Sequence, residues 1–300
     1  MKLALKVDVD TLRGTLEGVP RLVRIFERHR VGATFLYSLG PDHTGRALRR
    51  VFRRGFVGKV ARTSVVEHYG LRTLLYGTLL PGPDIGRRGA GVMRSARGAG
   101  FEAGIHCWDH VRWQDFVAEQ DAAWTEREMS LAFDRFQEVF GAAPRTYGAA
   151  GWQINGHALR WEARRGFAYC SDTRGSHPFL PVAEGDIIRC PQLPTTLPTM
   201  DELIGLDGVT PENVDRALLS RTEEPLPSGH VFTLHAEMEG MRLAPALERL
   251  LAGWRSQGYE LVAMDDYFAA VGGDKLPAHE VIRGEVPGRS GTLAVQGARR

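Results

Sequence analysis

The sequence has few cysteines and no long apolar run, and both absences exclude classes of protein. Three cysteines occur among 300 residues, an odd number without the CxxC spacing of a zinc knuckle. This pattern argues against a disulfide framework. No apolar run approaches the ~18 residues that cross a bilayer, and no signal-peptide pattern opens the chain. We therefore expect a cytoplasmic protein without a membrane span.

A large excess of either charge is also lacking. The chain carries 38 Lys and Arg against 36 Asp and Glu, which gives a net charge of +2. Such a balance does not predict a nucleic-acid-binding protein, because those proteins present a strongly basic surface. Hydrophobic residues make up 43% of the chain, enough to bury one large core. We therefore predict a single domain over residues 1–300.

The chain alternates short strand patterns with helical patterns, which predicts an α/β protein. Strands are expected at 3–9, 32–40, 100–106, 145–151, 166–172, 229–236 and 259–264. Helices are expected at 19–30, 121–140, 153–165 and 243–257. Repeated β–α units form a largely parallel sheet, closed as a barrel or open. In both arrangements the functional site lies at the carboxyl ends of the strands.

Polar side chains gather at those predicted strand ends. Parallel strands point their carboxyl ends toward one mouth of a barrel, so residues far apart in the sequence can meet there. We therefore treat the strand-end residues as candidates for one site. They are Asp8, Asp10, His106, His110, Asp172 and His235.

The spacing of His106 and His110 suggests a metal site but does not establish one. HxxxH fits a pair of metal ligands, and it equally fits two ordinary polar residues after a strand. Asp8 and Asp10, two residues apart on a strand, point to the same side, although DxD also caps turns. Two imidazoles with one carboxylate leave coordination positions open for water and substrate. Together the two patterns favour a divalent metal, with Zn, Co, Mn and Ni all accepted by such ligands.

His235 and Asp172 each have two interpretations. His235 is either a general acid at the site or a hydrogen-bonded core histidine. Asp172 either orients that imidazole or closes a turn after its strand. Their positions at strand ends favour the catalytic interpretation for both residues.

In order along the chain, these motifs resemble the five motifs of NodB-type polysaccharide deacetylases. The matching stretches are DVD at 8–10, HCWDH at 106–110, YGAAGW at 147–152, SDTRG at 171–175 and TLH at 233–235. The resemblance implies a distorted (β/α)7 barrel and a metal-dependent amidase with its active site at the carboxyl ends of the strands.

The resemblance also assigns roles to individual residues. Asp8 becomes the general base, His235 the general acid and Asp172 the partner that orients His235. The implied metal ligands are Asp10, His106 and His110. One departure is visible, because the third motif lacks the arginine of the wider superfamily. Arg145 and Arg174 are the candidates to replace it, and we favour Arg174.

Longer stretches resemble one deformylase family within that superfamily. They include residues 8–22, 38–46, 80–86 and 193–205. Members of this family hydrolyse the formamide of undecaprenyl phosphate-linked 4-deoxy-4-formamido-L-arabinose, giving formate and the amino sugar lipid. The resemblance thus implies a role in lipid A modification and in resistance to polymyxin and cationic antimicrobial peptides. We expect the oxyanion to be held by an N–H of the Tyr147–Gly148 turn. The expected substrate-binding residues are Tyr147, Trp152, Arg174 and Glu237.

One segment is strongly basic in this nearly neutral chain. Residues 43–66 contain seven Lys or Arg and no acid, within an insertion at about 43–82. Four apolar residues of the segment fall on one helical stripe: Leu48, Val51, Phe52 and Phe56. A basic amphipathic segment is typical of contact with an anionic membrane surface. The expected location is therefore the cytoplasmic face of the inner membrane.

Three other functions stay open at this point. The chain fits an N-deacetylase of another glycan, or a cytosolic cyclic-amide hydrolase on the same barrel. It also fits a catalytically inactive binding module at the membrane, although such a module needs neither ligands nor an acid and a base.

Overall fold

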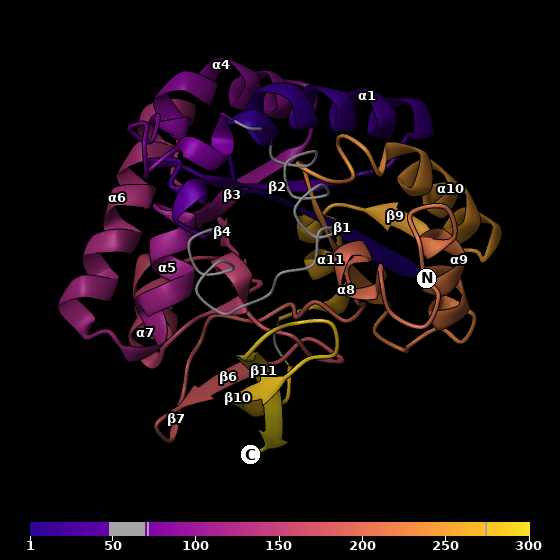
Figure 1. Ribbon diagram of the computed structural model, residues 1–300. Coiled ribbons are helices and arrows are strands. Elements are labelled where there is room, and N and C mark those ends of the chain that lie inside the picture. Colours follow the sequence, from indigo (N-terminus) through magenta and orange to yellow (C-terminus); the bar gives the residue numbers. More distant parts are fainter. Residues whose placement is uncertain (48–69, 71, 274) are drawn as a thin grey trace.

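A parallel sheet lies at the centre of the computed structural model, which describes residues 1–47, 70, 72–273 and 275–300 (Figure 1). Its strands run in the order β5-β4-β3-β2-β1-β8, and β9 also pairs with β1. The bounds are β1 Lys2–Val9, β2 Thr34–Ser38, β3 Glu102–Cys107, β4 Thr146–Tyr147, β5 Tyr169–Cys170, β8 His230–His235 and β9 Glu260–Val262. All seven expected strands therefore form, and every pair among them is parallel.

An irregular segment closes the gap between the two end strands of this sheet. The N–H of Cys170 in β5 donates to the carbonyl of Pro191 at 2.8 Å, and the N–H of Leu193 donates to the carbonyl of Cys170 at 2.8 Å. A few residues later, the N–H of Thr196 donates to Val231 of β8 at 3.0 Å. Residues 191–196 thus complete the barrel without forming a regular strand. The predicted distorted barrel is therefore present.

Helices pack around the outside of the barrel (Figure 1). The longer ones are α1 Val19–His29, α4 Ile85–Gly98, α5 His110–Phe116, α6 Ala122–Phe140, α7 Gly156–Arg165, α10 Ala244–Ser256 and α11 Met264–Val271. Two short ones are α8 Met200–Leu203 and α9 Val214–Leu219. In α1, Leu22 and Phe26 are completely buried, and each such side chain stabilises the fold by about 1.5–3 kcal/mol.

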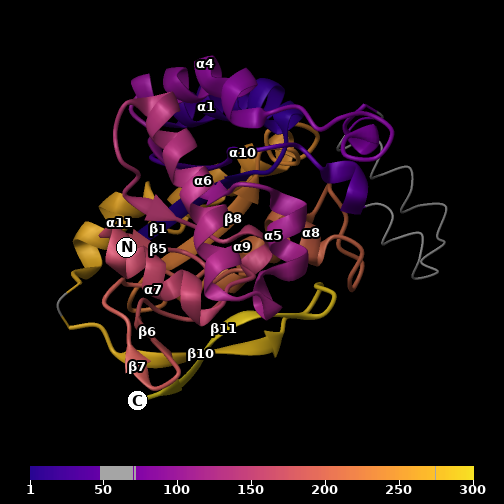
Figure 2. The same cartoon turned by 90° about the vertical axis from the view of Figure 1, so that its left-hand side faces the viewer.

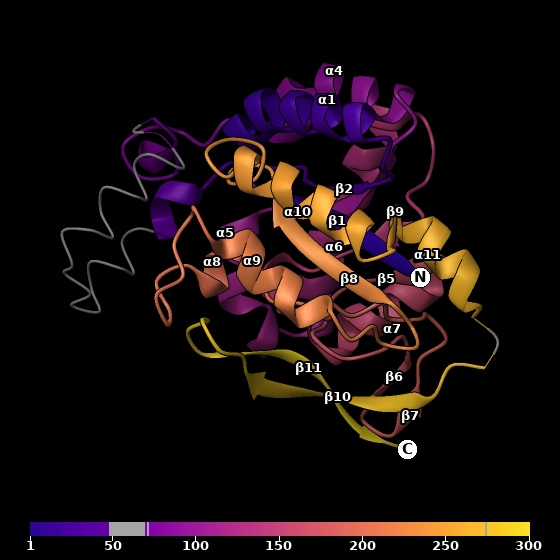
Figure 3. The same cartoon turned by 90° about the vertical axis from the view of Figure 1, so that its right-hand side faces the viewer.

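A second, smaller sheet covers one side of the barrel, and the sequence patterns did not predict it. It contains β6 Leu180–Ala183, β7 Asp186–Ile187, β10 Ala278–Glu285 and β11 Thr292–Arg299. Figures 2 and 3 both show β10 and β11 as a layer beneath the strands and helices of the barrel. The N–H of Arg174 donates to the carbonyl of Ala294 at 2.9 Å, so this sheet is attached directly to the loop after β5.

The expected insertion lies mostly outside the described residues. After residue 47 the structure describes residue 70 and then the chain from residue 72. The apolar stripe at 48–56 and the arginines beside it are therefore not described. In the described part of the chain, no helix combines the length and apolar character needed to cross a membrane.

Candidate metal centre

Three side chains from different elements meet at the carboxyl ends of β1 and β3. Asp10 follows β1, His106 lies on β3, and His110 begins α5. Oδ1 of Asp10 lies 3.3 Å from Nε2 of His106 and 3.5 Å from Nε2 of His110. The three potential ligand atoms all lie within 4.8 Å of one another. The predicted convergence of these residues is therefore present.

The protonation of His106 makes this cluster suitable for a cation. Nδ1 of His106 lies 2.6 Å from the carbonyl of Gly148, which can only accept, so Nδ1 carries the proton. In the neutral ring Nε2 then directs its lone pair toward the Asp10 carboxylate. Oδ1 of Asp10 is buried and has no hydrogen-bond partner among the described residues. Two lone-pair donors facing each other in a buried site fit a divalent ion between them.

The charges at the cluster also suit metal binding. Burial by itself would raise the pKa of Asp10, but the imidazoles of His110 and His106 hold it well below its usual range. Burial lowers the pKa of His110, which favours the neutral, coordinating form of its ring. The donor set is thus one carboxylate and two imidazole rings.

Glu237 holds the loop that carries Asp10. Its Oε1 accepts hydrogen bonds from the N–H of Asp10 at 3.1 Å, the N–H of Thr11 at 2.9 Å and Oγ1 of Thr11 at 2.7 Å. A Cβ added at Gly14 would lie 1.8 Å from the same oxygen, so glycine is required there. Its other oxygen, Oε2, has no hydrogen-bond partner among the described residues, and the expected contact of Glu237 with a sugar hydroxyl stays a prediction.

Asp8 and His235 lie opposite each other on neighbouring strands. They are register partners in β1 and β8, so both side chains leave the sheet on the same side. Asp8 is 3% exposed, and its Oδ1 has no hydrogen-bond partner among the described residues. The two residues are therefore placed to act on one substrate from adjacent positions.

A buried lysine provides the cation beside Asp8. Nζ of Lys6 lies 3.6 Å from Oδ2 of Asp8 and donates to the carbonyl of Ser171 at 3.0 Å, and the side chain is fully buried. The sequence analysis overlooked Lys6, although it stands two residues before Asp8 on the same face of β1. Neither Arg145 nor Arg174 takes this position. Arg145 is exposed next to the other end of β4.

Arg174 belongs to a structural cluster around Trp152. Its Nη1 lies 2.5 Å from Oε1 of Glu202, and its guanidinium lies 4.8 Å from the centre of the Trp152 ring. Trp152 is 2% exposed and also packs against Lys6 and Arg289, at 5.4 and 5.0 Å. Arg174 and Trp152 thus pack against each other and against neighbouring protein groups. Nε of Arg174 has no hydrogen-bond partner among the described residues, and the expected contacts of Arg174 and Trp152 with substrate stay predictions.

Tyr147 is a core residue. Its side chain is completely buried and packs against Trp113 and Phe167. The N–H of Gly148 donates to the carbonyl of Ile105 at 2.9 Å. The ring of Tyr147 thus packs in the core and the sheet uses the N–H of Gly148, while the expected contacts of this turn with substrate and oxyanion stay predictions.

Asp172 does not orient His235. Its two oxygens accept from the N–H of Ala149 at 2.8 Å and from Nε2 of Gln192 at 2.6 Å. Nδ1 of His235 has no hydrogen-bond partner among the described residues. Asp172 instead ties the loop after β4 to the segment that closes the barrel, and burial raises its pKa to about 6.

The carboxylates around His235 come from residues that the sequence analysis did not select. Burial would lower the pKa of His235, but Asp201, Asp10 and Glu239 raise it to about 9. Asp201 lies on α8, and Oε2 of Glu239 accepts a hydrogen bond from the N–H of His235 at 2.8 Å. No residue spacing around Asp201 pointed to the site in the sequence. Asp201 reaches the barrel mouth only through the irregular path of residues 191–201.

Comparison with solved structures identifies the fold. A Mycobacterium smegmatis protein assigned as a polysaccharide deacetylase superposes with a TM-score of 0.63, at 19% identity over 95% of this chain and 94% of that one. A family 4 acetyl xylan esterase from Clostridium thermocellum, in complex with a cobalt ion, gives a TM-score of 0.51 at 12% identity, over 90% of this chain and 91% of that one. The fold is that of the NodB-type polysaccharide deacetylases.

Sequence comparison identifies the family to which the chain belongs within this class of fold. A protein from Shewanella sediminis (strain HAW-EB3), assigned as the 4-deoxy-4-formamido-L-arabinose-phosphoundecaprenol deformylase ArnD, is 36% identical over 98% of this chain and 94% of its own. A Wigglesworthia glossinidia brevipalpis protein with the same assignment is 30% identical over 94% of this chain and 98% of its own. No family model matches the chain. The chain belongs to the ArnD deformylase family.

The cluster of Asp10, His106 and His110 generates a direct prediction. His106→Ala removes one donor and unties the carbonyl of Gly148, so we expect the purified variant to lose bound metal. Metal content measured by mass spectrometry tests this, with His157→Ala, a histidine on α7, as the matched control. A metal content equal to that of the wild type in the His106 variant would show that the cluster does not bind the ion.

Proposed function

We propose that this protein hydrolyses the formamide of undecaprenyl phosphate-linked 4-deoxy-4-formamido-L-arabinose, releasing formate and leaving the amino sugar on its lipid. The relatives assigned as ArnD support this substrate. The observation that carries the proposal is the placement of Asp8 and His235 on adjacent strands, next to three potential metal ligands. Hydrolysis of an amide needs a base for water and an acid for the leaving amine, and this pair supplies both.

In this proposal Asp10, His106 and His110 hold a divalent ion. When bound, the ion supplies a Lewis acid that lowers the pKa of water and polarises the formyl oxygen. The hydrogen bond from His106 to Gly148 fixes one ligand, and the hydrogen bonds of Glu237 fix the backbone of Asp10. The donors allow Zn, Co, Mn or Ni, and the geometry does not select among them.

Asp8 acts as the general base and His235 as the general acid. Asp8 accepts a proton from the attacking water while the water oxygen bonds to the formyl carbon. His235 then donates a proton to the sugar nitrogen as the C–N bond breaks, so the products are formate and the free amine. Asp201 and Glu239 favour the protonated form of His235 that this step requires.

Lys6 positions the base. A carboxylate as buried as Asp8 needs a partner for the oxygen that does not face the reaction, and Nζ of Lys6 lies 3.6 Å from Oδ2. With Oδ2 held in this way, Oδ1 is left for the proton of water.

The family assignment and the basic segment together support a membrane setting. We extend the proposal to lipid A modification and polymyxin resistance, and to docking of residues 43–66 on the anionic cytoplasmic leaflet. Most of that segment lies outside the described residues, so its charge pattern alone supports this part. Two other activities, deacetylation of a different glycan and cyclic-amide hydrolysis, lack comparable support.

The roles of base and acid predict a loss of turnover with the metal retained. We expect Asp8→Asn and His235→Ala to lower the rate of formate release by roughly 10²–10⁴-fold, the usual contribution of such groups. Formate release from the lipid-linked formamido sugar and metal content are measured on the same samples. A near wild-type rate in either variant removes that residue from the mechanism. Preference for the matching acetamido sugar would instead identify a deacetylase.

The role of Lys6 predicts a difference between two substitutions. Lys6→Met keeps the length of the side chain but removes its charge, and we expect kcat to fall by ~10²-fold, as for a misplaced catalytic group. Lys6→Arg keeps the charge and should recover most of this loss. If both variants lose kcat equally while remaining folded and metal-loaded, packing at Lys6 matters and its charge does not.

Membrane docking predicts a salt-sensitive effect of four arginines. Replacing Arg49, Arg50, Arg53 and Arg54 with Gln removes a charge of +4, and each basic residue near an anionic leaflet contributes about 1 kcal/mol. We therefore expect weaker sedimentation with anionic vesicles at low salt. Binding equal to that of the wild type would exclude docking through these arginines.

A further inference from the structure

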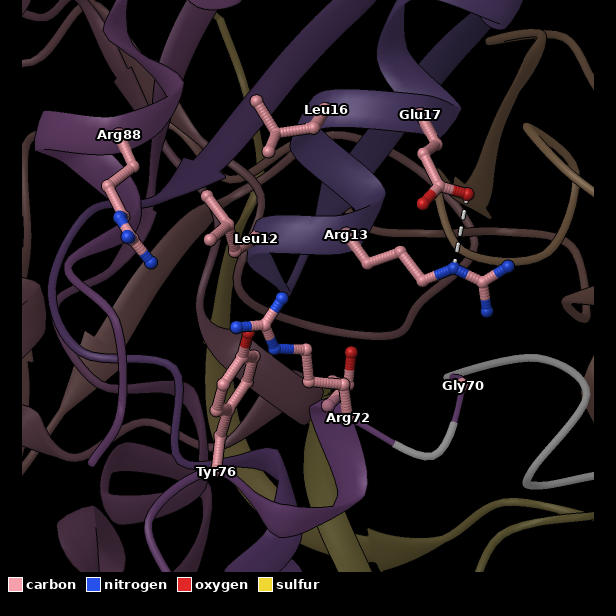
Figure 4. Close-up of a pocket in the computed structure, with 9 residues that line it drawn as sticks. Leu12, Arg13, Leu16, Glu17, Gly70, Arg72, Tyr76 and Arg88 are labelled. Atoms are coloured by element: carbon pink, nitrogen blue, oxygen red, sulfur yellow. Dashed lines mark hydrogen bonds and ion pairs between the residues drawn. The ribbon is translucent and has the colours of Figure 1, made fainter. Parts of the chain in front are cut away.

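A cavity of about 670 Å³ is lined by residues 12–17 of the segment after Asp10, by residues between 70 and 76, and by Arg88 of α4 (Figure 4). We call it the arginine cavity. Its lining residues are Leu12, Arg13, Leu16, Glu17, Gly70, Arg72, Thr73, Tyr76 and Arg88. None of them belongs to the base, the acid or the candidate ligands, so the activity described above leaves the cavity without a role.

The lining carries an excess of positive charge. Arg13 pairs with Glu17 at 3.1 Å, which leaves the charges of Arg72 and Arg88. Both of these side chains are exposed, and neither forms an ion pair with another described residue. In Figure 4 the guanidinium groups of Arg72 and Arg88 lie on either side of Leu12. Arginine presents a planar fork of donors that suits phosphate oxygens, so the cavity fits a phosphate group.

The same lining has an apolar part. Leu16 is 44% exposed although it is a large aliphatic side chain, and Leu12 and the ring of Tyr76 complete this surface. A small inorganic anion has no use for apolar contacts. A ligand that joins a phosphate to a hydrocarbon chain satisfies both parts of the lining.

The cavity shares a wall with the metal centre. Leu12 and Arg13 follow Asp10 by two and three residues, and three residues span at most about 11 Å of chain. The position of this wall is fixed, because the N–H of Leu12 donates to Oδ2 of Asp42 at 2.9 Å. A ligand in the cavity is therefore separated from the candidate metal by little more than the Asp10–Arg13 turn.

We propose that the arginine cavity binds the phosphodiester of the lipid-linked substrate through Arg72 and Arg88, and the first part of its prenyl chain along Leu12 and Leu16. This inference rests on the proposed function. A pyranose carries its 4-nitrogen and its anomeric oxygen at opposite ends of the ring. When the formamide lies at the metal, the phosphate lies one sugar ring away, and the cavity next to the Asp10–Arg13 turn offers a place for it.

The test compares variants of Arg72 and Arg88 with a variant of Arg87, the neighbour of Arg88 on α4. Arg72→Gln and Arg88→Gln should each raise KM for a short-chain prenyl phosphate-linked formamido sugar by roughly tenfold, as expected when one charge-assisted hydrogen bond is lost. Arg87→Gln is the matched control, because Arg87 is exposed on α4 but does not line the cavity. The rise in KM is expected only with substrates that carry the phosphate. An equal rise in KM for Arg87→Gln would mean that general surface charge, and not this cavity, attracts the substrate.

A direct binding measurement separates this inference from the proposed function. Calorimetry with a short-chain prenyl phosphate should detect binding to the wild-type enzyme, and at least tenfold weaker binding to the Arg72→Gln, Arg88→Gln double variant and to Leu16→Gln. Equal affinity of the wild type and the double variant would overturn the proposal. Equal affinity for inorganic phosphate and prenyl phosphate would overturn its apolar part. If the wild type releases no formate from the lipid-linked sugar, the proposed function fails, while the binding data still decide the role of the cavity.

Discussion

The close approach of the Asp10 carboxylate to two imidazoles is the contact on which the rest of the site depends. Oδ1 of Asp10 lies within 3.5 Å of a ring nitrogen of each histidine, and the hydrogen bond from His106 to Gly148 leaves one of these nitrogens without a proton. Lone pairs at this separation repel in a buried site unless a cation lies between them. The surrounding structure maintains this arrangement. Glu237 fixes the backbone of Asp10, and α5 begins at His110.

A second set of buried charges lies directly beneath the first. Asp8 pairs with Lys6, Lys6 also binds the loop after β5 at Ser171, and Asp172 binds the loop after β4 and Gln192 of the closing segment. A buried charge without a partner costs several kcal/mol, so this network holds the irregular parts of the barrel in place. The same network sets the environment of Asp8, the proposed base.

The sequence was sufficient to predict the barrel and the residues at its mouth. Alternating strand and helix patterns located all seven strands of the main sheet, and the DxD and HxxxH spacings located Asp8, Asp10 and the two histidines. The partners of those residues were harder to predict. Lys6 reads as an ordinary strand residue, and Asp201 reaches the site only through the irregular path of residues 191–201. Glu237 was expected in the cavity because strand alternation was extended two residues beyond His235, where β8 ends, and the bonds of its Oε1 to the Asp10–Thr11 turn were not foreseen. The small sheet was missed because β6 and β7 are short and the strongest β–α pattern ends before β10.

The central claim is that one divalent ion, held by Asp10, His106 and His110, supports hydrolysis of the formamide. The most direct measurement is a titration of the chelated, metal-free protein with Zn²⁺ or Co²⁺, followed by formate release from the lipid-linked formamido sugar. The account predicts no activity without metal and a linear rise that stops at one equivalent. Full activity in the metal-free protein would contradict it.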